Sequence, residues 1–186
     1  MLDKFLQKIS NSTPQQLAEQ YLFEGSVHVM SENKDYEKYL ALIKNDYQNA
    51  QHIAIMGSAN WGVSLNPRKN LKLFDETSDI DVAIVCIDSF NRTWEELRKY
   101  HRENYYLVPY EQKEKLKRIG ENVYSGFICP KWIPNRNAKC FFEYEINTNN
   151  YSNRAVAFKK VNMMYFKNID EVIDYYIWGF KAARPK

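Results

Sequence analysis

The stretch from Ile53 to Val85, IAIMGSANWGVSLNPRKNLKLFDETSDIDVAIV, decides the fold that we expect for this chain. An apolar run over residues 52–56 predicts a short strand, which Gly57 and Ser58 end. A second run over residues 80–86 is rich in β-branched side chains and predicts a strand that is covered on both faces. The order is therefore a strand, a glycine-serine corner, a short helix and a second strand.

Two carboxylates, Asp79 and Asp81, stand at the start of the second predicted strand. Side chains two positions apart in a strand share a face, so both carboxylates project together while Ile80 faces the core. Mg²⁺ prefers oxygen ligands and is usually held by one or two carboxylates together with substrate phosphates. Gly57 lets the backbone approach a phosphate, and Ser58 with the first N–H groups of the next helix can bind it. This pattern predicts magnesium-dependent phosphoryl or nucleotidyl chemistry.

Length and composition favour one globular domain. The chain has 186 residues, of which 45% are hydrophobic, enough to form a core without disulfides. Its net charge of +3 is too small to indicate a protein that coats nucleic acid or a membrane surface. Three widely spaced cysteines predict free thiols in a reducing compartment rather than a zinc site. No run approaches the ~20 apolar residues of a membrane span, so we expect a cytoplasmic protein without a membrane partner.

The flanking sequence predicts helices around the sheet. Thr13-Pro14-Gln15-Gln16 predicts a capped helix to about residue 24, and apolar residues repeat with a helical period over 33–47. Thr93 and Asn168 are further capping signals, and residues 155–166 have room for a late strand. We expect a single domain over residues 1–186, with a helical lead-in over 1–50, a catalytic sheet core over 51–147 and a C-terminal strand and helix over 148–186.

These motifs together resemble the DNA polymerase beta-like nucleotidyltransferase superfamily, whose signature is a hydrophobic strand, Gly-Ser, a short helix and a strand bearing Asp-x-Asp. The matching residues are Gly57, Ser58, Asp79 and Asp81. The resemblance implies an α/β (α+β) fold in which a small mixed β-sheet is flanked by α-helices, here with extra helices at both ends. It also implies that the two aspartates bind two Mg²⁺ ions that orient a nucleoside triphosphate.

The family places a third carboxylate on a neighbouring strand, where it binds metal and helps to deprotonate the acceptor. Residues 138–146 alternate enough to predict such a strand, and they contain Glu143 and Glu145. We favour Glu143, because Phe142 and Tyr144 bracket it near the middle of the run, although glutamate replaces the usual aspartate. The alternative is that both glutamates line the solvated face of an edge strand.

Two basic segments have open interpretations. The connection over residues 66–77 is an insertion relative to the smallest members of the family, and its Arg68, Lys69 and Lys72 either reach a triphosphate or solvate a loop. The segment over residues 131–139 combines cations with a tryptophan, as grooves for single-stranded nucleic acid do, although a solvated surface is the plainer interpretation.

The expected function is Mg²⁺-dependent transfer of a nucleoside monophosphate, AMP in the first instance, from a nucleoside triphosphate to a hydroxyl of RNA, protein or a small molecule. Asp79 and Asp81 would hold the ions, with Glu143 as third ligand and base. The alternative is a nucleotidyltransferase-like module that binds nucleotide, RNA or a partner without catalysis. A metal nuclease ranks below both. Aspartates that lie apart, or a glutamate that does not face Asp79, would count against catalysis.

Overall fold

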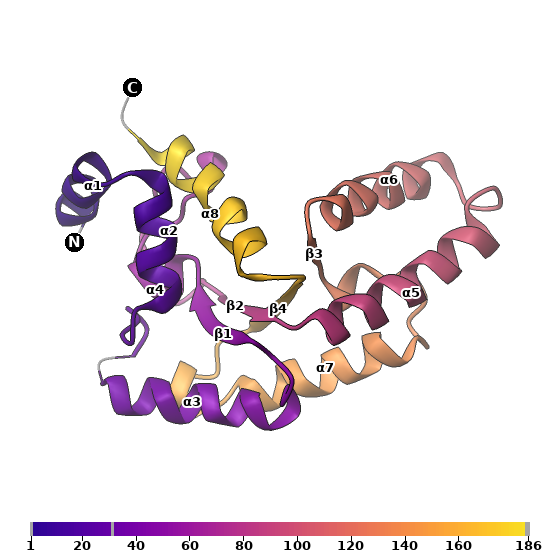
Figure 1. Cartoon of the computed structure of the whole chain (residues 1–186), viewed down its shortest axis with the longest axis horizontal. Coiled ribbons are helices and arrows are strands. Elements are labelled where there is room, and N and C mark those ends of the chain that lie inside the picture. Colours follow the sequence, from indigo (N-terminus) through magenta and orange to yellow (C-terminus); the bar gives the residue numbers. More distant parts are fainter. Residues whose placement is uncertain (1, 31, 185–186) are drawn as a thin grey trace.

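The computed structural model describes residues 2–30 and 32–184, and it has a mixed α/β architecture (Figure 1). Helices surround a four-stranded sheet, as the sequence predicts at the level of fold class. The elements are α1 (Leu2–Asn11), α2 (Pro14–Phe23), α3 (Asn33–Asp46), β1 (His52–Met56), α4 (Ser58–Trp61), β2 (Ile80–Val85), α5 (Ile87–Asn104), α6 (Tyr110–Tyr124), β3 (Phe127–Ile128), α7 (Lys139–Tyr151), β4 (Val161–Phe166) and α8 (Ile169–Ala183), with short 3₁₀ turns at Pro67–Lys69, Pro130–Trp132 and Arg154–Val156.

The strand order in the sheet is β1-β2-β4-β3. Strand β2 runs antiparallel to β1 and parallel to β4, and the short β3 pairs antiparallel with β4. In this register Asp81 lies opposite Met56 on one side and opposite Asn162 on the other. The central position of β2 explains why its sequence is almost entirely apolar after its acidic start.

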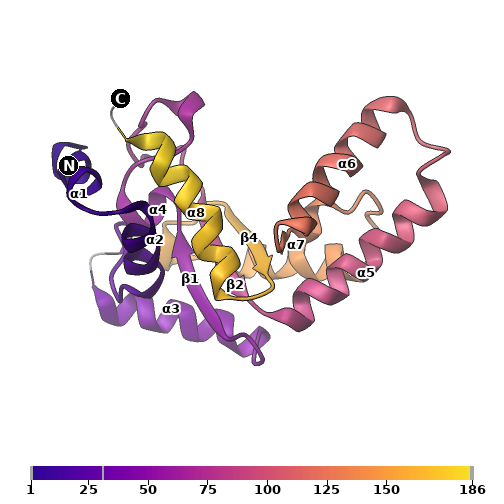
Figure 2. The same cartoon turned by 45° about the horizontal axis from the view of Figure 1, so that its top comes forward.

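Both faces of the sheet are covered, so two hydrophobic layers form. Alternate residues of β2 point to opposite sides: Ile80, Val82 and Ile84 join one core, while Ala83 and Val85 join the other. The first core includes apolar residues of α3, α5 and α7, and the second includes those of α2 and α8. Helix α8 crosses the sheet on this second face (Figure 2), which is also the face toward which Asp81 points by alternation.

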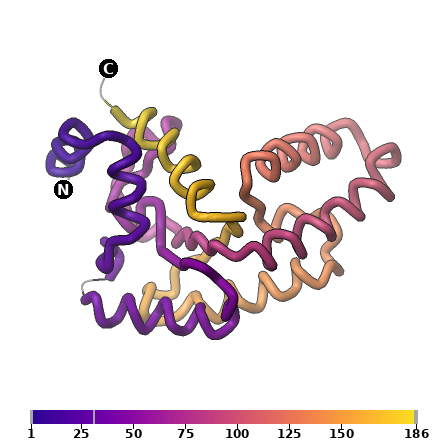
Figure 3. The backbone as a smooth tube through the Cα atoms, in the orientation of Figure 1, coloured from indigo at the N-terminus to yellow at the C-terminus, as the bar shows by residue number. Residues whose placement is uncertain are grey.

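The helices after β2 leave the sheet and return to it. Helices α5 and α6 form a hairpin that projects from the strands (Figure 3), and its connection exposes Tyr106 and Leu107. Helix α7 then comes back beneath the sheet beside α3. Hydrogen bonds join these two helices, because the Tyr39 hydroxyl donates to the Tyr151 carbonyl and the Tyr151 hydroxyl donates to Asp46.

Two of the predicted strands and two of the predicted caps are confirmed. Strands occupy residues 52–56 and 80–85, where the sequence predicts strands over 52–56 and 80–86. Thr13 and Gln16 form a complete capping box, and the Asn168 side chain accepts the backbone N–H of Glu171 at the start of α8.

Two local predictions are wrong. Residues 139–151 form helix α7 instead of the strand predicted over 138–146, because the buried positions of this segment recur at a helical rather than a two-residue spacing: Cys140, Tyr144, Thr148 and Tyr151. Thr93 does not cap a helix either. It lies inside α5, where its hydroxyl donates to the Ser89 carbonyl one turn earlier.

Candidate functional site

The corner after β1 has a backbone that glycine alone adopts readily. Gly57 has φ 69° and ψ −157°, and helix α4 begins at the next residue, Ser58. A Cβ atom built on Gly57 would lie 3.0 Å from Oδ2 of Asp81. The corner therefore brings the main chain of Gly57 directly against one of the predicted carboxylates.

Asp79 and Asp81 lie together, as the sequence predicts, and an amide from the neighbouring strand bridges them. The side-chain Nδ2 of Asn162 is 2.6 Å from Oδ2 of Asp79 and 3.4 Å from Oδ1 of Asp81. The parallel register of β2 and β4 explains this contact, because it sets Asn162 directly opposite Asp81. One face of the sheet thus gathers two carboxylates and one carboxamide.

The electrostatics of this cluster favour a cation. Burial, followed by the nearby negative charge of Asp79, raises the pKa of Asp81 to about 6 from its usual 3.8, while Asn162 and Lys69 act in the opposite direction. Two carboxylates this close repel one another when both are ionised. A bound divalent cation would remove that repulsion, and the available donors are the oxygens that Mg²⁺ prefers.

A cleft of about 530 Å³ opens over the two aspartates. Its walls come from the Gly57 corner, the segment after α4 and helix α8. Gly179 lets α8 approach that segment, since a Cβ there would lie 3.1 Å from a methyl carbon of Leu65. Trp178 lines the cleft and is 73% exposed, and the Lys181 ammonium lies over its ring, 5.1 Å from the centroid.

The basic residues of the 66–77 connection divide into two groups. Lys69 lines the cleft beside the aspartates. Lys72 instead stays within the connection, where it forms an ion pair with Asp75 at 2.8 Å and donates to the Thr77 hydroxyl. Of the three predicted cations, Lys69 is the one placed to approach a bound triphosphate, and Arg68 is exposed outside the lining of the cleft.

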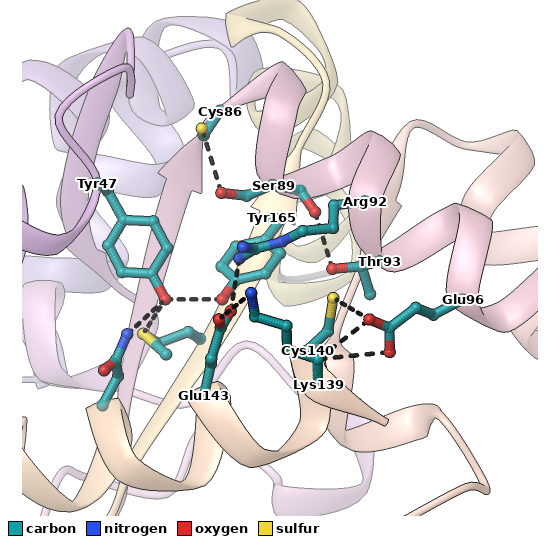
Figure 4. A network of polar contacts seen from close by, with 12 residues as sticks. Tyr47, Cys86, Ser89, Arg92, Thr93, Glu96, Lys139, Cys140, Glu143 and Tyr165 are labelled. Carbon is teal, nitrogen blue, oxygen red and sulfur yellow. Dashed lines mark hydrogen bonds and ion pairs between the residues drawn. The ribbon is translucent and has the colours of Figure 1, made fainter. Parts of the chain in front are cut away.

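Glu143 does not join the aspartates. It lies on α7, where its carboxylate pairs with Arg92 of α5 at 2.9 Å and with Lys139 at 3.8 Å (Figure 4). The network drawn in Figure 4 also contains the Tyr47 and Tyr165 hydroxyls, which are 2.7 Å apart. The prediction that Glu143 faces Asp79 from a neighbouring strand is therefore corrected: this carboxylate ties α7 to α5.

Glu145 is also on α7, and it lines a second cavity of about 500 Å³ together with Asn162. Within residues 2–30 and 32–184, no three His, Cys, Asp or Glu side chains are grouped as a metal site. The position beside the aspartate pair belongs to Asn162, which the sequence interpretation missed. Its signal is an asparagine at the second position of the otherwise apolar and aromatic strand β4.

No family model, curated protein or solved structure matches this chain. In the part of the chain that the structure describes, no helix combines the length and the apolar character needed to cross a bilayer. The chemistry of the cleft is consequently inferred from its own donor groups. The carboxylate oxygens of Asp79 and Asp81 are donors that fit a hard cation such as Mg²⁺, and they lie next to the Gly57 and Ser58 corner that lines the same cleft.

Proposed function

We propose that this protein is a Mg²⁺-dependent nucleotidyltransferase that transfers a nucleoside monophosphate, AMP in the first instance, from a nucleoside triphosphate to an acceptor hydroxyl. One observation carries this proposal: Asp79 and Asp81 lie side by side against the Gly57 corner, at the base of an open cleft. In the reaction, the hydroxyl oxygen bonds to the α-phosphorus, the bond to the leaving pyrophosphate breaks, and the hydroxyl proton passes to solvent.

Each wall of the cleft has a role in this proposal. Asp79 and Asp81 would hold the metal, which when bound supplies positive charge that stabilises the phosphate oxygens. The Ser58 hydroxyl donates to a phosphate oxygen at the corner, and the Lys69 ammonium offsets triphosphate charge. The exposed ring of Trp178 offers a surface on which a nucleobase stacks.

A second candidate function is nucleotide binding without transfer, and Asn162 favours it. A carboxamide has no basic site comparable to a carboxylate, so Asn162 does not accept a proton from an acceptor hydroxyl. General base catalysis typically accelerates reactions 10²–10⁴-fold, so a site with Asn162 at this position transfers more slowly than one with a carboxylate. The two candidate functions can be distinguished because slow transfer releases pyrophosphate, whereas binding without transfer does not.

The test incubates the protein with Mg²⁺ and α-labelled nucleoside triphosphates in the presence of RNA, protein and small-molecule acceptors. We expect labelled product and pyrophosphate from the wild type and a loss of about 100-fold or more in Asp79→Asn/Asp81→Asn, because even outer ligands of metal sites are worth 10–100-fold. Glu143→Gln is the matched carboxylate control and should retain activity within about two-fold, since its partners are Arg92 and Lys139.

Binding of a fluorescent ATP analogue separates the two candidates. Mg²⁺-dependent binding that requires the aspartates, without release of pyrophosphate, would favour the silent module. Equal product from the wild type and the double aspartate variant would contradict transfer at this site. Absence of Mg²⁺-dependent nucleotide binding would contradict both candidates.

A further inference from the structure

The second cavity adjoins the aspartate pair through a shared residue. Asn162 lines this cavity of about 500 Å³ and also donates from its amide to Asp79 and Asp81. The remaining walls come from the 3₁₀ turn at Pro130–Trp132, from Arg136 in the segment before α7, from α7 and from residues before and at the start of β4. Asn162 is therefore a residue that borders this cavity and also contacts both carboxylates.

The charge of the cavity is predominantly positive. Lys131, Arg136 and Lys160 line it, against the single carboxylate of Glu145. Within the described residues, neither lysine forms an ion pair with a carboxylate. Three exposed cations around one hollow make a site for an anion, since an anion there interacts favourably with several charges at once.

The two lysines also lie close to each other. Contact with the Lys160 ammonium, followed by partial burial and by the charge of Lys160, lowers the pKa of Lys131. Two lysine ammonium groups that converge without a carboxylate between them repel each other. An anion with two or more oxygens, such as a phosphate ester, would accept hydrogen bonds from both.

Aromatic rings line the same cavity. The guanidinium of Arg136 lies over the ring of Phe141, 4.4 Å from its centroid, and Phe158 is 71% exposed. Cations beside exposed rings are the combination with which proteins bind the phosphates and bases of single-stranded nucleic acid. The volume suits a ligand of about nucleotide size, since small-molecule sites range over about 300–1,000 Å³.

We propose that this second cavity binds a phosphate group of the acceptor through Lys131 and Lys160, so that the acceptor is a phosphate ester with a free hydroxyl. Two sources share this chemistry: the end of a single-stranded RNA and a phosphorylated small molecule. The proposal rests on the proposed function in one respect, since it assigns the first cleft to the donor nucleotide. Asn162 then lies between the donor cleft and the acceptor cavity.

The test compares Lys131→Gln/Lys160→Gln with Lys115→Gln/Lys117→Gln, which removes the same charge from exposed positions on α6. The probes are a fluorescent single-stranded hexauridylate and ribose 5-phosphate, the latter followed by calorimetry. We expect Lys131→Gln/Lys160→Gln to weaken binding about 10-fold for the probe that represents the true acceptor, either hexauridylate for an RNA end or ribose 5-phosphate for a small molecule. For hexauridylate, the slope of log affinity against log salt should fall by about 0.7, the value for one lost phosphate contact on a single strand. The α6 variant should change affinity by less than about two-fold.

Each outcome bears on the proposal. If Lys131→Gln/Lys160→Gln weakens the binding of hexauridylate, the acceptor is an RNA end. If it weakens only the binding of ribose 5-phosphate, the acceptor is a phosphorylated small molecule. Either result supports the phosphate site. Unchanged binding of both probes, or equal loss in the α6 variant, would overturn it. Equal loss of Mg²⁺-dependent ATP binding would also overturn it, because the lysines would then serve the donor. Failure of the proposed function is separate: it appears as ATP binding that does not depend on Asp79 and Asp81.

Discussion

Replacing Gly57 with alanine tests the geometry of the corner most sharply. Its φ of 69° and ψ of −157° lie in a region that only glycine occupies without strain, and an alanine there costs about 1–3 kcal/mol. The new Cβ would also lie 3.0 Å from Oδ2 of Asp81, so the carboxylate must shift. For a chain of this size, that cost lowers the melting temperature by about 2–12 °C, at 2–4 °C per kcal/mol.

Gly25→Ala is the matched control for this substitution. No atom lies within 4 Å of a Cβ built on Gly25, and its backbone lies outside the left-handed region. Alanine at a compatible position stabilises a protein by about 0.4–1 kcal/mol through the unfolded chain. Thermal unfolding of both variants, followed by circular dichroism in EDTA, should therefore move in opposite directions. Equal melting temperatures for the two variants would refute the strained corner.

The same variant has a functional consequence. Below its melting temperature, Gly57→Ala should bind Mg²⁺ and ATP about 10-fold more weakly than the wild type, because the displaced Asp81 carboxylate no longer lines up with Asp79. Fluorescent ATP titrations at several Mg²⁺ concentrations measure this effect. If Gly57→Ala is clearly destabilised but binds Mg²⁺ and ATP with wild-type affinity, Gly57 contributes to folding and not to ligand binding.

Three further changes probe the cluster and the cleft. The fold raises the pKa of Asp81 to about 6 from 3.8, so ionisation of Asp81 costs the folded state about 3 kcal/mol as the pH rises through this window. In EDTA, Asp81→Asn should therefore be more stable than the wild type by up to that amount at pH 7.5 but not at pH 3.5. Urea unfolding at the two pH values measures this difference. A penalty that is independent of pH would contradict this. Asn162→Asp adds a third carboxylate, so it should lower the stability of the protein in EDTA and recover that stability in Mg²⁺. It should also raise the rate of pyrophosphate release about 10-fold or more. An unchanged rate would show that Asn162 does not limit the rate of transfer. Trp178→Ala should weaken ATP binding about 10-fold while leaving tripolyphosphate binding unchanged, whereas equal losses for both ligands would exclude base stacking.

The parts of the site that were predictable depend on neighbours in the chain. A two-residue period places Asp79 and Asp81 on one face whatever else the chain does, and an apolar run ending at Gly57 predicts a strand and its turn. These local relations explain why the strand pair and the aspartate cluster agree with the structure. The same holds for the cap at Thr13, whose partner is only three residues away.

The wrong prediction for Glu143 shows the limit of local sequence patterns. The segment around Glu143 is rich in aromatic residues and reads as either a strand or a helix over a short window. Its helical period becomes evident only when the buried Thr148 and Tyr151 are included. A strand would have aligned Glu143 with the sheet, whereas the helix directs it to Arg92.

The pairing of β2 with β4 depends on the whole fold. Asn162 reaches Asp79 from 83 residues away in the chain, and no local pattern specifies which strand lies beside β2 or in what register. Lys131 and Lys160 likewise meet because separate segments border one cavity. Contacts of this kind follow from tertiary packing, so the acceptor cavity was not predictable from the spacing of its residues.

A crystal structure grown with Mg²⁺ and a nonhydrolysable ATP analogue would test the function of the cleft most directly. We expect metal density between Asp79 and Asp81, the triphosphate against Gly57 and Ser58, and the base beside Trp178. Analogue bound at another surface, with the aspartates still joined through Asn162 and no metal between them, would contradict a nucleotide site at this corner.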